Sequence, residues 1–255
     1  MIYFGIPLRS KSVSHNWEEV CEVFERTLRS AYHQTNPDFK IFVACHDLPT
    51  LRHTYDDRVE FLRADTPFPT DSYEMMLDKG WKISMIAAKI REAGGGYTML
   101  LDSDDMVSNR IAQYCVDHPG TNGFVSLHGY IYNEGLSYVK RTFKLYRICG
   151  SCSIINYSVD DLPDHMPANF HDDLKDQYII RRSHREIPNY MASIGRKLKT
   201  IPFITTVYVR NTGDNHSMLD GNDLSKARKL ELFFRRKEKI TEKMRREFGL
   251  VPLGK

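Results

Sequence analysis

The chain has 255 residues, 41% hydrophobic and 27% charged, with 36 Lys and Arg against 33 Asp and Glu. This length and apolar content allow one large domain with a sizeable core, and no apolar stretch is long enough to span a membrane. Five cysteines, odd in number and with a single CxxC pair, and an N-terminus without the apolar core of a signal peptide indicate buried reduced thiols and a cytoplasmic protein.

The first 120 residues alternate between strand and helix patterns. Strands are expected at residues 2–7, 39–45, 58–62 and 98–101, and helices at 17–32, 49–55, 74–93 and 109–117. Strands separated by helices usually pair in parallel, and ligands bind just outside the carboxyl ends of such strands. Arg9, Ser10 and Lys11 follow the first strand, where basic and hydroxyl groups could contact a nucleotide, with ordinary loop residues as the alternative.

The apolar run 98–101 continues into Asp102, Ser103, Asp104 and Asp105. Such a run indicates a buried strand that ends at a polar edge. Asp102 and Asp104 have the spacing of a Mg²⁺ or Mn²⁺ site, in which one or two carboxylates act together with substrate phosphates and water. The alternative is an acidic turn with Asp105 capping the next helix. We favour the metal site because the motif follows a buried strand.

The second half has neighbouring strand patterns, which predict antiparallel pairing. Strands are expected at residues 123–132, 139–148, 153–157 and 203–209, and helices at 172–183, 189–198 and 224–248. A polar loop at 213–216 precedes the last helix. That helix is strongly basic, because residues 226–246 hold ten Lys or Arg and three Glu.

Three short stretches carry a resemblance to a known family. Residues 26–45 match a first helix and second strand, residues 100–105 match an Asp-x-Asp motif, and residues 172–173 match an acidic base motif. In these places, and in the order of elements over residues 1–220, the chain resembles the family-2-like glycosyltransferases of the GT-A fold, with bacterial rhamnosyltransferase-like members nearest. The resemblance implies an α/β fold with a Rossmann-type, mostly parallel sheet flanked by helices, antiparallel acceptor-side strands and a long C-terminal helix.

The same resemblance implies an inverting hexosyl transfer in polysaccharide biosynthesis. The donor would be a nucleotide-diphosphate sugar, the acceptor a hydroxyl of a glycan or lipid-linked molecule, and no nucleic acid would bind. Residues 1–120 would form the nucleotide-sugar-binding half of the domain, residues 121–220 its acceptor and catalytic half, and residues 221–255 the basic C-terminal helix. A Mn²⁺ or Mg²⁺ ion bridging the phosphates would stabilise the charge that develops on the leaving nucleoside diphosphate.

Carried onto this sequence, the family motif gives Asp104 as a direct metal ligand. Asp102 would bind the metal through water or contact the ribose, and Ser103 lies between them in the donor-binding motif. His216 would add an imidazole ligand, which Mn²⁺ accepts more readily than Mg²⁺ does. A solvated loop histidine is the alternative at position 216.

The resemblance also assigns contacts to the nucleotide. Pro7 and Arg9 would meet it after the first strand, and Asp47 matches the position that meets the base. The family's usual Asp-Asp-Gly-Ser run is here His-Asp-Leu-Pro. Lys82 matches a helix position that approaches the phosphates, with a solvated helix lysine as the alternative.

The acceptor hydroxyl needs a general base, and the acidic pair supplies one. The resemblance places the base at Asp173, with Asp172 as the competitor. The family usually has Glu before Asp, whereas this chain has two Asp. A predicted helix start favours an ionised carboxylate, and N-capping is the structural alternative there.

The basic C-terminal helix has two interpretations. Its apolar residues could lie on anionic lipid, which would attach the protein peripherally to the inner face of the membrane. Alternatively they pack on the catalytic domain or on a second copy of the chain. We favour packing, because glutamates within the helix can pair with its basic residues.

Two other functions compete with sugar transfer. A nucleotidyltransferase can use a similar sheet and acidic pair, but that class usually has a glycine-rich basic loop after its first strand. Residues 9–11, Arg-Ser-Lys, contain no glycine. A non-catalytic protein that binds nucleotide sugars is the third possibility.

Overall fold

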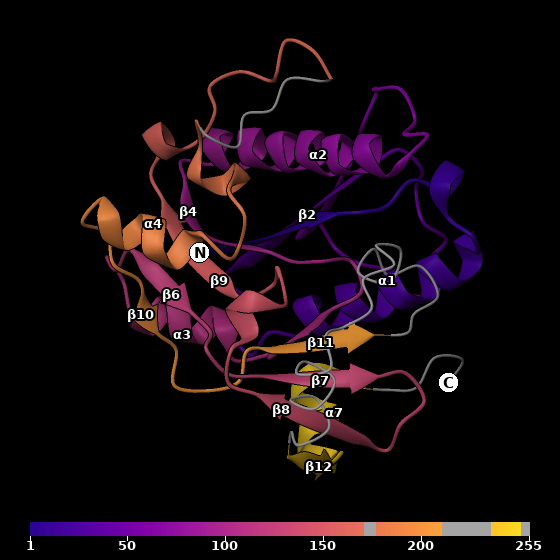
Figure 1. The fold of residues 1–255 in the computed structure, drawn as a ribbon, viewed down its shortest axis with the longest axis vertical. Coiled ribbons are helices and arrows are strands. Elements are labelled where there is room, and N and C mark those ends of the chain that lie inside the picture. Colours follow the sequence, from indigo (N-terminus) through magenta and orange to yellow (C-terminus); the bar gives the residue numbers. More distant parts are fainter. Residues whose placement is uncertain (171–176, 211–235, 251–255) are drawn as a thin grey trace, which may run out of the picture.

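Two sheets organise the chain in the computed structural model, which describes residues 1–170, 177–210 and 236–250 (Figure 1). The larger sheet has seven strands and the smaller has five. In the larger sheet only β9 runs antiparallel to its neighbours. The predicted α/β fold with a mostly parallel sheet is therefore confirmed. In spatial order the larger sheet contains β10 (Lys199–Thr200), β6 (Gly123–Val125), β9 (Ser153–Tyr157), β4 (Gly96–Leu100), β1 (Ile2–Pro7), β2 (Phe39–Cys45) and β3 (Val59–Arg63).

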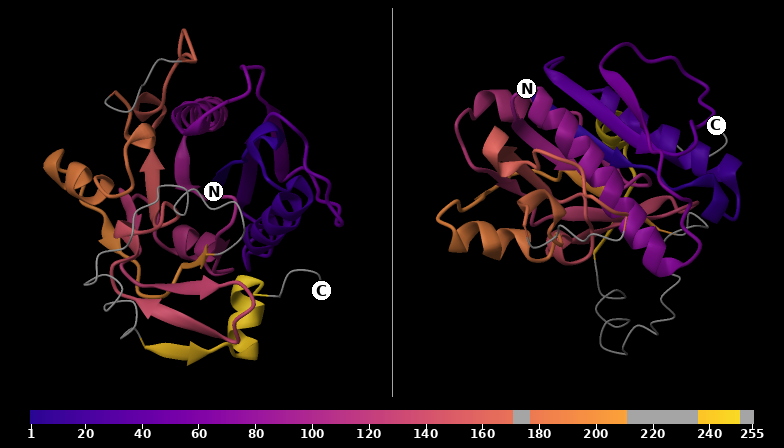
Figure 2. Two further views of the ribbon diagram at one scale, coloured as in Figure 1. Left: turned by 45° about the vertical axis from the view of Figure 1, so that its right-hand side comes forward. Right: turned by 90° about the horizontal axis from the view of Figure 1, so that it is seen from above.

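Helices cover both faces of the larger sheet (Figures 1 and 2). α1 (Trp17–Tyr32) and α3 (Ile111–Asp117) pack on one face, and α2 (Ser72–Glu92) and α4 (Ile187–Ser193) pack on the other. The alternation along β1 explains this layering, because successive strand residues point to opposite faces. Phe4 packs in the α1 cluster, whereas Tyr3 packs in the α2 cluster. Asp71 caps α2 by accepting the Glu74 amide N–H.

The smaller sheet lies beside the larger one, and residues 237–239 supply one of its edge strands (Figure 1). Its strand order is β12 (Lys237–Lys239), β8 (Tyr138–Thr142), β7 (Gly129–Asn133), β11 (Thr206–Arg210) and β5 (Met106–Val107). The short helix α7 (Glu242–Phe248) buries Met244 and Phe248 against this sheet. All of its strand pairs are antiparallel except β11 with β7.

The prediction of one helix over residues 224–248 is wrong where the structure describes it. Residues 237–239 form an edge strand on β8, and α7 begins only at Glu242, after the N-cap Thr241. Residues 224–235 lie outside the described ranges. The apolar residues Ile240, Met244 and Phe248 are buried, so this part of the basic segment packs on the domain, as the favoured interpretation expected.

Other predicted elements were also revised. No helix forms at 49–55, because the Glu25 carboxylate accepts the backbone N–H groups of Arg52 and His53. The expected strand 123–132 is divided between β6 and β7, which belong to different sheets. The strand expected at 139–148 ends at Thr142, and residues 177–183 contain only a short 3₁₀ turn. The 3₁₀ turns are η1 (Lys11–Val13), η2 (Leu145–Arg147), η3 (Val159–Asp161) and η4 (Ile179–Arg181).

The helices in the described ranges are either too short or too polar to cross a membrane.

Candidate functional site

A cavity of about 370 Å³ opens at the carboxyl ends of β1 and β4, beside α2. This is the edge at which parallel sheets bind ligands, and the volume is within the range of small-molecule sites. Leu8, Val13, Val20 and Val23 give it an apolar side. Six of the predicted site residues line it: Pro7, Arg9, Lys82, Asp102, Ser103 and Asp104.

Asp102 faces a lysine that the sequence analysis did not assign to the site. The Lys79 ammonium donates to Asp102 Oδ1 over 2.6 Å, and both side chains line the cavity. Burial raises the pKa of Asp102, but the Lys79 charge and hydrogen bond outweigh it, so the pKa lies below its ordinary value. Asp102 is therefore ionised at neutral pH, and Asp102 raises the pKa of Lys79 in turn.

Asp104 lines the same cavity. Burial and the neighbouring charge of Asp102 raise the pKa of Asp104 to about 7. Burial and Asp102 thus disfavour the ionised form of Asp104, and a bound divalent cation would favour it. Two carboxylates suit Mg²⁺ or Mn²⁺ when substrate phosphates complete the coordination, so the residues present fit such an ion.

Asp105 points away from the cavity into the protein. Its carboxylate is fully buried and accepts from Ser151 Oγ at 2.7 Å, Cys149 Sγ at 3.1 Å and the Val209 N–H at 3.1 Å. The alternative that it caps the following helix is wrong, because α3 begins only at Ile111. Asp105 instead ties the acidic motif to β11 and to the turn before β9.

That turn, residues 149–152, supports the acidic motif on the side away from the cavity. Ser151 Oγ accepts the Asp102 N–H at 2.9 Å while donating to Asp105, so one hydroxyl links two of the aspartates. At Gly150 an added Cβ would lie 2.7 Å from Asp102 Oδ2, so only glycine fits there without displacing that carboxylate. The expectation of buried reduced thiols is confirmed, since all five cysteines are free and buried.

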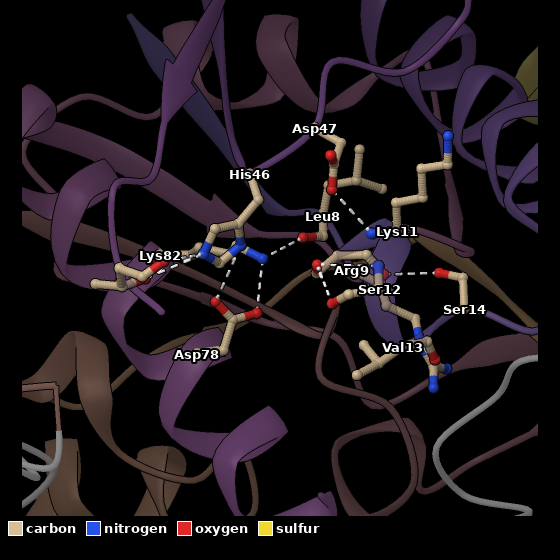
Figure 3. A network of polar contacts seen from close by, with 12 residues as sticks. Leu8, Arg9, Lys11, Ser12, Val13, Ser14, His46, Asp47, Asp78 and Lys82 are labelled. Atoms are coloured by element: carbon tan, nitrogen blue, oxygen red, sulfur yellow. Dashed lines mark hydrogen bonds and ion pairs between the residues drawn. The ribbon is translucent and has the colours of Figure 1, made fainter. Parts of the chain in front are cut away.

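Asp47 and Lys82 support the loop that follows β1 (Figure 3). Asp47 accepts the Lys11 N–H at 3.0 Å, and Lys82 Nζ donates to the Leu8 carbonyl at 2.7 Å. Lys82 is only 1% exposed, so the alternative of a solvated helix lysine is wrong. Contact of Asp47 with the base and of Lys82 with phosphates stays a prediction.

A buried polar network anchors Lys82 (Figure 3). Its ammonium donates to Asp78 Oδ2 at 2.6 Å, and the other carboxylate oxygen of Asp78 lies 3.5 Å from His46 Nδ1. Burial lowers the pKa of Lys82, an effect that Asp78 opposes. The network fixes the end of β2 and the loop after β1 to the first half of α2.

The segment after η4 brings two more side chains to the cavity, His184 and Arg185. The Arg181 guanidinium at the end of η4 packs on α2 at Gly80, where an added Cβ would displace it. Burial lowers the pKa of His184, which favours the neutral imidazole. The basic run at 181–185 was the sequence signal that could have indicated these residues.

Three predicted site residues, Asp172, Asp173 and His216, lie outside the described ranges. Their proposed roles therefore stay predictions. Across residues 1–170, 177–210 and 236–250, no group of three or more His, Cys, Asp or Glu side chains is arranged to hold a metal ion.

No protein-family model matches the chain, and no curated protein matches it. Among solved structures, S. aureus TarS is similar at 11% identity with a TM-score of 0.46, over 82% of this chain and 36% of that one. In the TarS 1–349 structure the TM-score is 0.44, and the match covers 60% of that chain. A nucleoside-diphosphate-sugar pyrophosphorylase from Vibrio cholerae RC9 is similar at 12% identity with a TM-score of 0.38, over 86% of this chain and 98% of that one. At this level the similarities assign no family to the chain.

Proposed function

We propose that the chain is a metal-dependent, inverting glycosyltransferase that moves a hexosyl group from a nucleotide-diphosphate donor to a hydroxyl of a glycan or lipid-linked acceptor. The observation that carries the proposal is the cavity at the ends of β1 and β4. It combines an apolar side with a charged side made by Lys79, Asp102 and Asp104. A nucleotide sugar has the same division, with a flat base at one end and a diphosphate near the reacting sugar.

Each part of the cavity then has a role in the transfer. The apolar side chains after β1 would bind the nucleoside and exclude water from it. Asp104, with Asp102 directly or through water, would hold Mn²⁺ or Mg²⁺, which supplies charge stabilisation to the leaving diphosphate. The acceptor hydroxyl would lose its proton to Asp173, or to Asp172, as it attacks the sugar from the face opposite the diphosphate, which inverts the anomeric centre.

The loop after β1 favours this function over nucleotidyl transfer. A glycine-rich phosphate loop binds phosphates through backbone N–H groups that point at the ligand. Here the N–H groups of Lys11, Ser12, Val13 and Ser14 donate to Asp47 or within the loop itself. A loop whose donors are already used is poorly suited to hold a triphosphate.

The decisive experiment is a panel of nucleotide sugars with Mn²⁺, followed first by thermal shift and then by release of nucleoside diphosphate with and without acceptor. Bound donor should raise the melting temperature by mass action, and turnover should require the metal. Asp104→Ala should abolish Mn²⁺-dependent donor binding without unfolding the protein, whereas Asp57→Ala, at an exposed carboxylate, should change nothing.

Two outcomes separate the alternative functions. Donor binding without turnover would indicate a non-catalytic binding protein, and release of pyrophosphate from a nucleoside triphosphate and a sugar phosphate would indicate a nucleotidyltransferase.

The general base is tested by a variant of its own: Asp173→Asn should keep donor binding and lose transfer. If Asp172→Asn has that effect instead, the base is one residue earlier.

A further inference from the structure

Two lysines one turn apart on α2 line the cavity, and their environments are opposite. Lys82 is 1% exposed, and its ammonium is fixed by Asp78 and by the Leu8 carbonyl. Lys79 is 51% exposed, and its ammonium donates to Asp102, whose side chain is 27% exposed. Lys79 is therefore the lysine of this pair whose charge can change partner.

The contact between Lys79 and Asp102 is easily exchanged. Ion pairs that water reaches contribute little to stability, because solvent screens them and the long side chain loses freedom when it is held. Asp102 belongs to the carboxylate pair suited to a divalent cation. A cation on Asp102 would repel the lysine ammonium that is now 2.6 Å from the same carboxylate.

We propose that Lys79 is a phosphate-binding residue that exchanges partners: its ammonium neutralises Asp102 until a divalent cation binds there, and then binds the diphosphate of the donor. The inference rests on the proposed function, because it assumes that a diphosphate occupies the charged side of the cavity. A phosphate bound to the metal lies next to the acidic pair by necessity, and Lys79 is adjacent to both aspartates. A lysine ammonium is a compact, mobile donor suited to phosphate oxygens.

Partner exchange predicts two effects of opposite sign in one variant. Lys79→Met keeps the aliphatic stem and removes the charge. Because the competing ammonium is gone, this variant should bind Mn²⁺ alone several-fold more tightly than the unchanged protein. Because the phosphate donor is gone, it should bind pyrophosphate in saturating Mn²⁺ about tenfold more weakly.

The measurements use Mn²⁺ alone, followed by the electron paramagnetic resonance signal of the free ion, and pyrophosphate, followed by calorimetry. Lys89→Met is the matched control, because Lys89 lies on the same helix and pairs with Glu60 and Glu92 instead. It should change neither affinity. Lys79→Arg keeps a cation and should stay close to the unchanged protein in both titrations.

The proposal is overturned if Lys79→Met binds Mn²⁺ no more tightly, if it binds pyrophosphate normally, or if both affinities fall together, as a local collapse of the site would produce. Neither readout involves sugar transfer. A protein that shows both shifts but transfers no sugar would retain this role of Lys79 and lose the proposed function. If the protein transfers sugar but Lys79→Met changes neither affinity, the proposed function stands and this role of Lys79 is lost.

Discussion

Three carboxylates within four residues have three different environments, which the sequence cannot distinguish. Asp102 is paired with Lys79, Asp104 carries a raised pKa in the cavity, and Asp105 is buried behind them. Their spacing predicted a metal site, which stays a prediction, and the end of a parallel strand correctly predicted that Asp102 and Asp104 lie at the sheet edge. The partners Lys79 and Ser151 come from distant elements, so no local pattern indicated them.

Ser151→Ala tests the support behind the acidic motif. The substitution removes one hydroxyl that serves both Asp102 and Asp105 in a fully buried position, and leaves two polar groups without that partner. We expect a loss of about 1–3 kcal/mol in the free energy of unfolding, measured with urea. Ser193→Ala removes an exposed hydroxyl at the end of α4 and should cost less than half as much. Equal effects would show that Ser151 has no special structural role.

Glu25 gives the protein a predictable response to acid. Burial raises the pKa of Glu25, but the hydrogen bonds from His53 and Arg52 together lower it by more. The pKa of Glu25 in the folded protein is therefore below its value in the unfolded chain. A lowered carboxylate pKa stabilises the fold above the unfolded value, about 4.3, and that contribution is lost as the pH falls through the folded value. Glu25→Gln should therefore reduce the urea midpoint at pH 7 and have a smaller effect at pH 3. A constant difference between the two pH values would contradict this assignment.

At the scale of elements, Gly80 on α2 leaves room for the Arg181 guanidinium. Alanine normally stabilises a helix interior relative to glycine by about 0.5–1 kcal/mol. Here the new Cβ would meet the Arg181 guanidinium, so Gly80→Ala should not raise the melting temperature. The double variant Gly80→Ala with Arg181→Ala should recover the gain relative to Arg181→Ala alone. If Gly80→Ala by itself raises the melting temperature, the Arg181 guanidinium moves aside at no cost and the explanation is wrong.

Elements that bury a complete face were predictable, and elements decided by a distant partner were not. The strands at 2–7 and 39–45 are buried over nearly their whole length, and the helix at 17–32 has an apolar face at helical spacing. The structure contains all three with those bounds. Residues 49–55 and 237–239 depend on Glu25 and on the free edge of β8. The apolar spacing that included Ile240 and Met244 correctly predicted the burial of these two residues, but it does not show where a helix begins.

At the scale of the molecule, α7 belongs to the core. Phe248 is 2% exposed and packs among the residues of the smaller sheet. Phe248→Ala should cost about 3–5 kcal/mol in the free energy of unfolding, measured by denaturant titration. Phe143→Ala removes the same side chain where it is 61% exposed and should cost within about 0.5 kcal/mol. A small effect at position 248 would mean that α7 docks only loosely.

This role of the C-terminal residues also constrains the order of events during synthesis. Ser108 Oγ donates to a carboxylate oxygen of Glu247, 139 residues later, and the Asn109 N–H donates to the Glu247 carbonyl. Contacts between residues so far apart in the sequence form slowly, because closing the long loop between them costs conformational entropy before the contacts stabilise the fold. On the ribosome, β5 would emerge long before β11 and α7. The nascent chain would expose Met106 and Val139 until β11 and α7 had been translated, so the smaller sheet should fold later than the part of the larger sheet formed by β1 to β4.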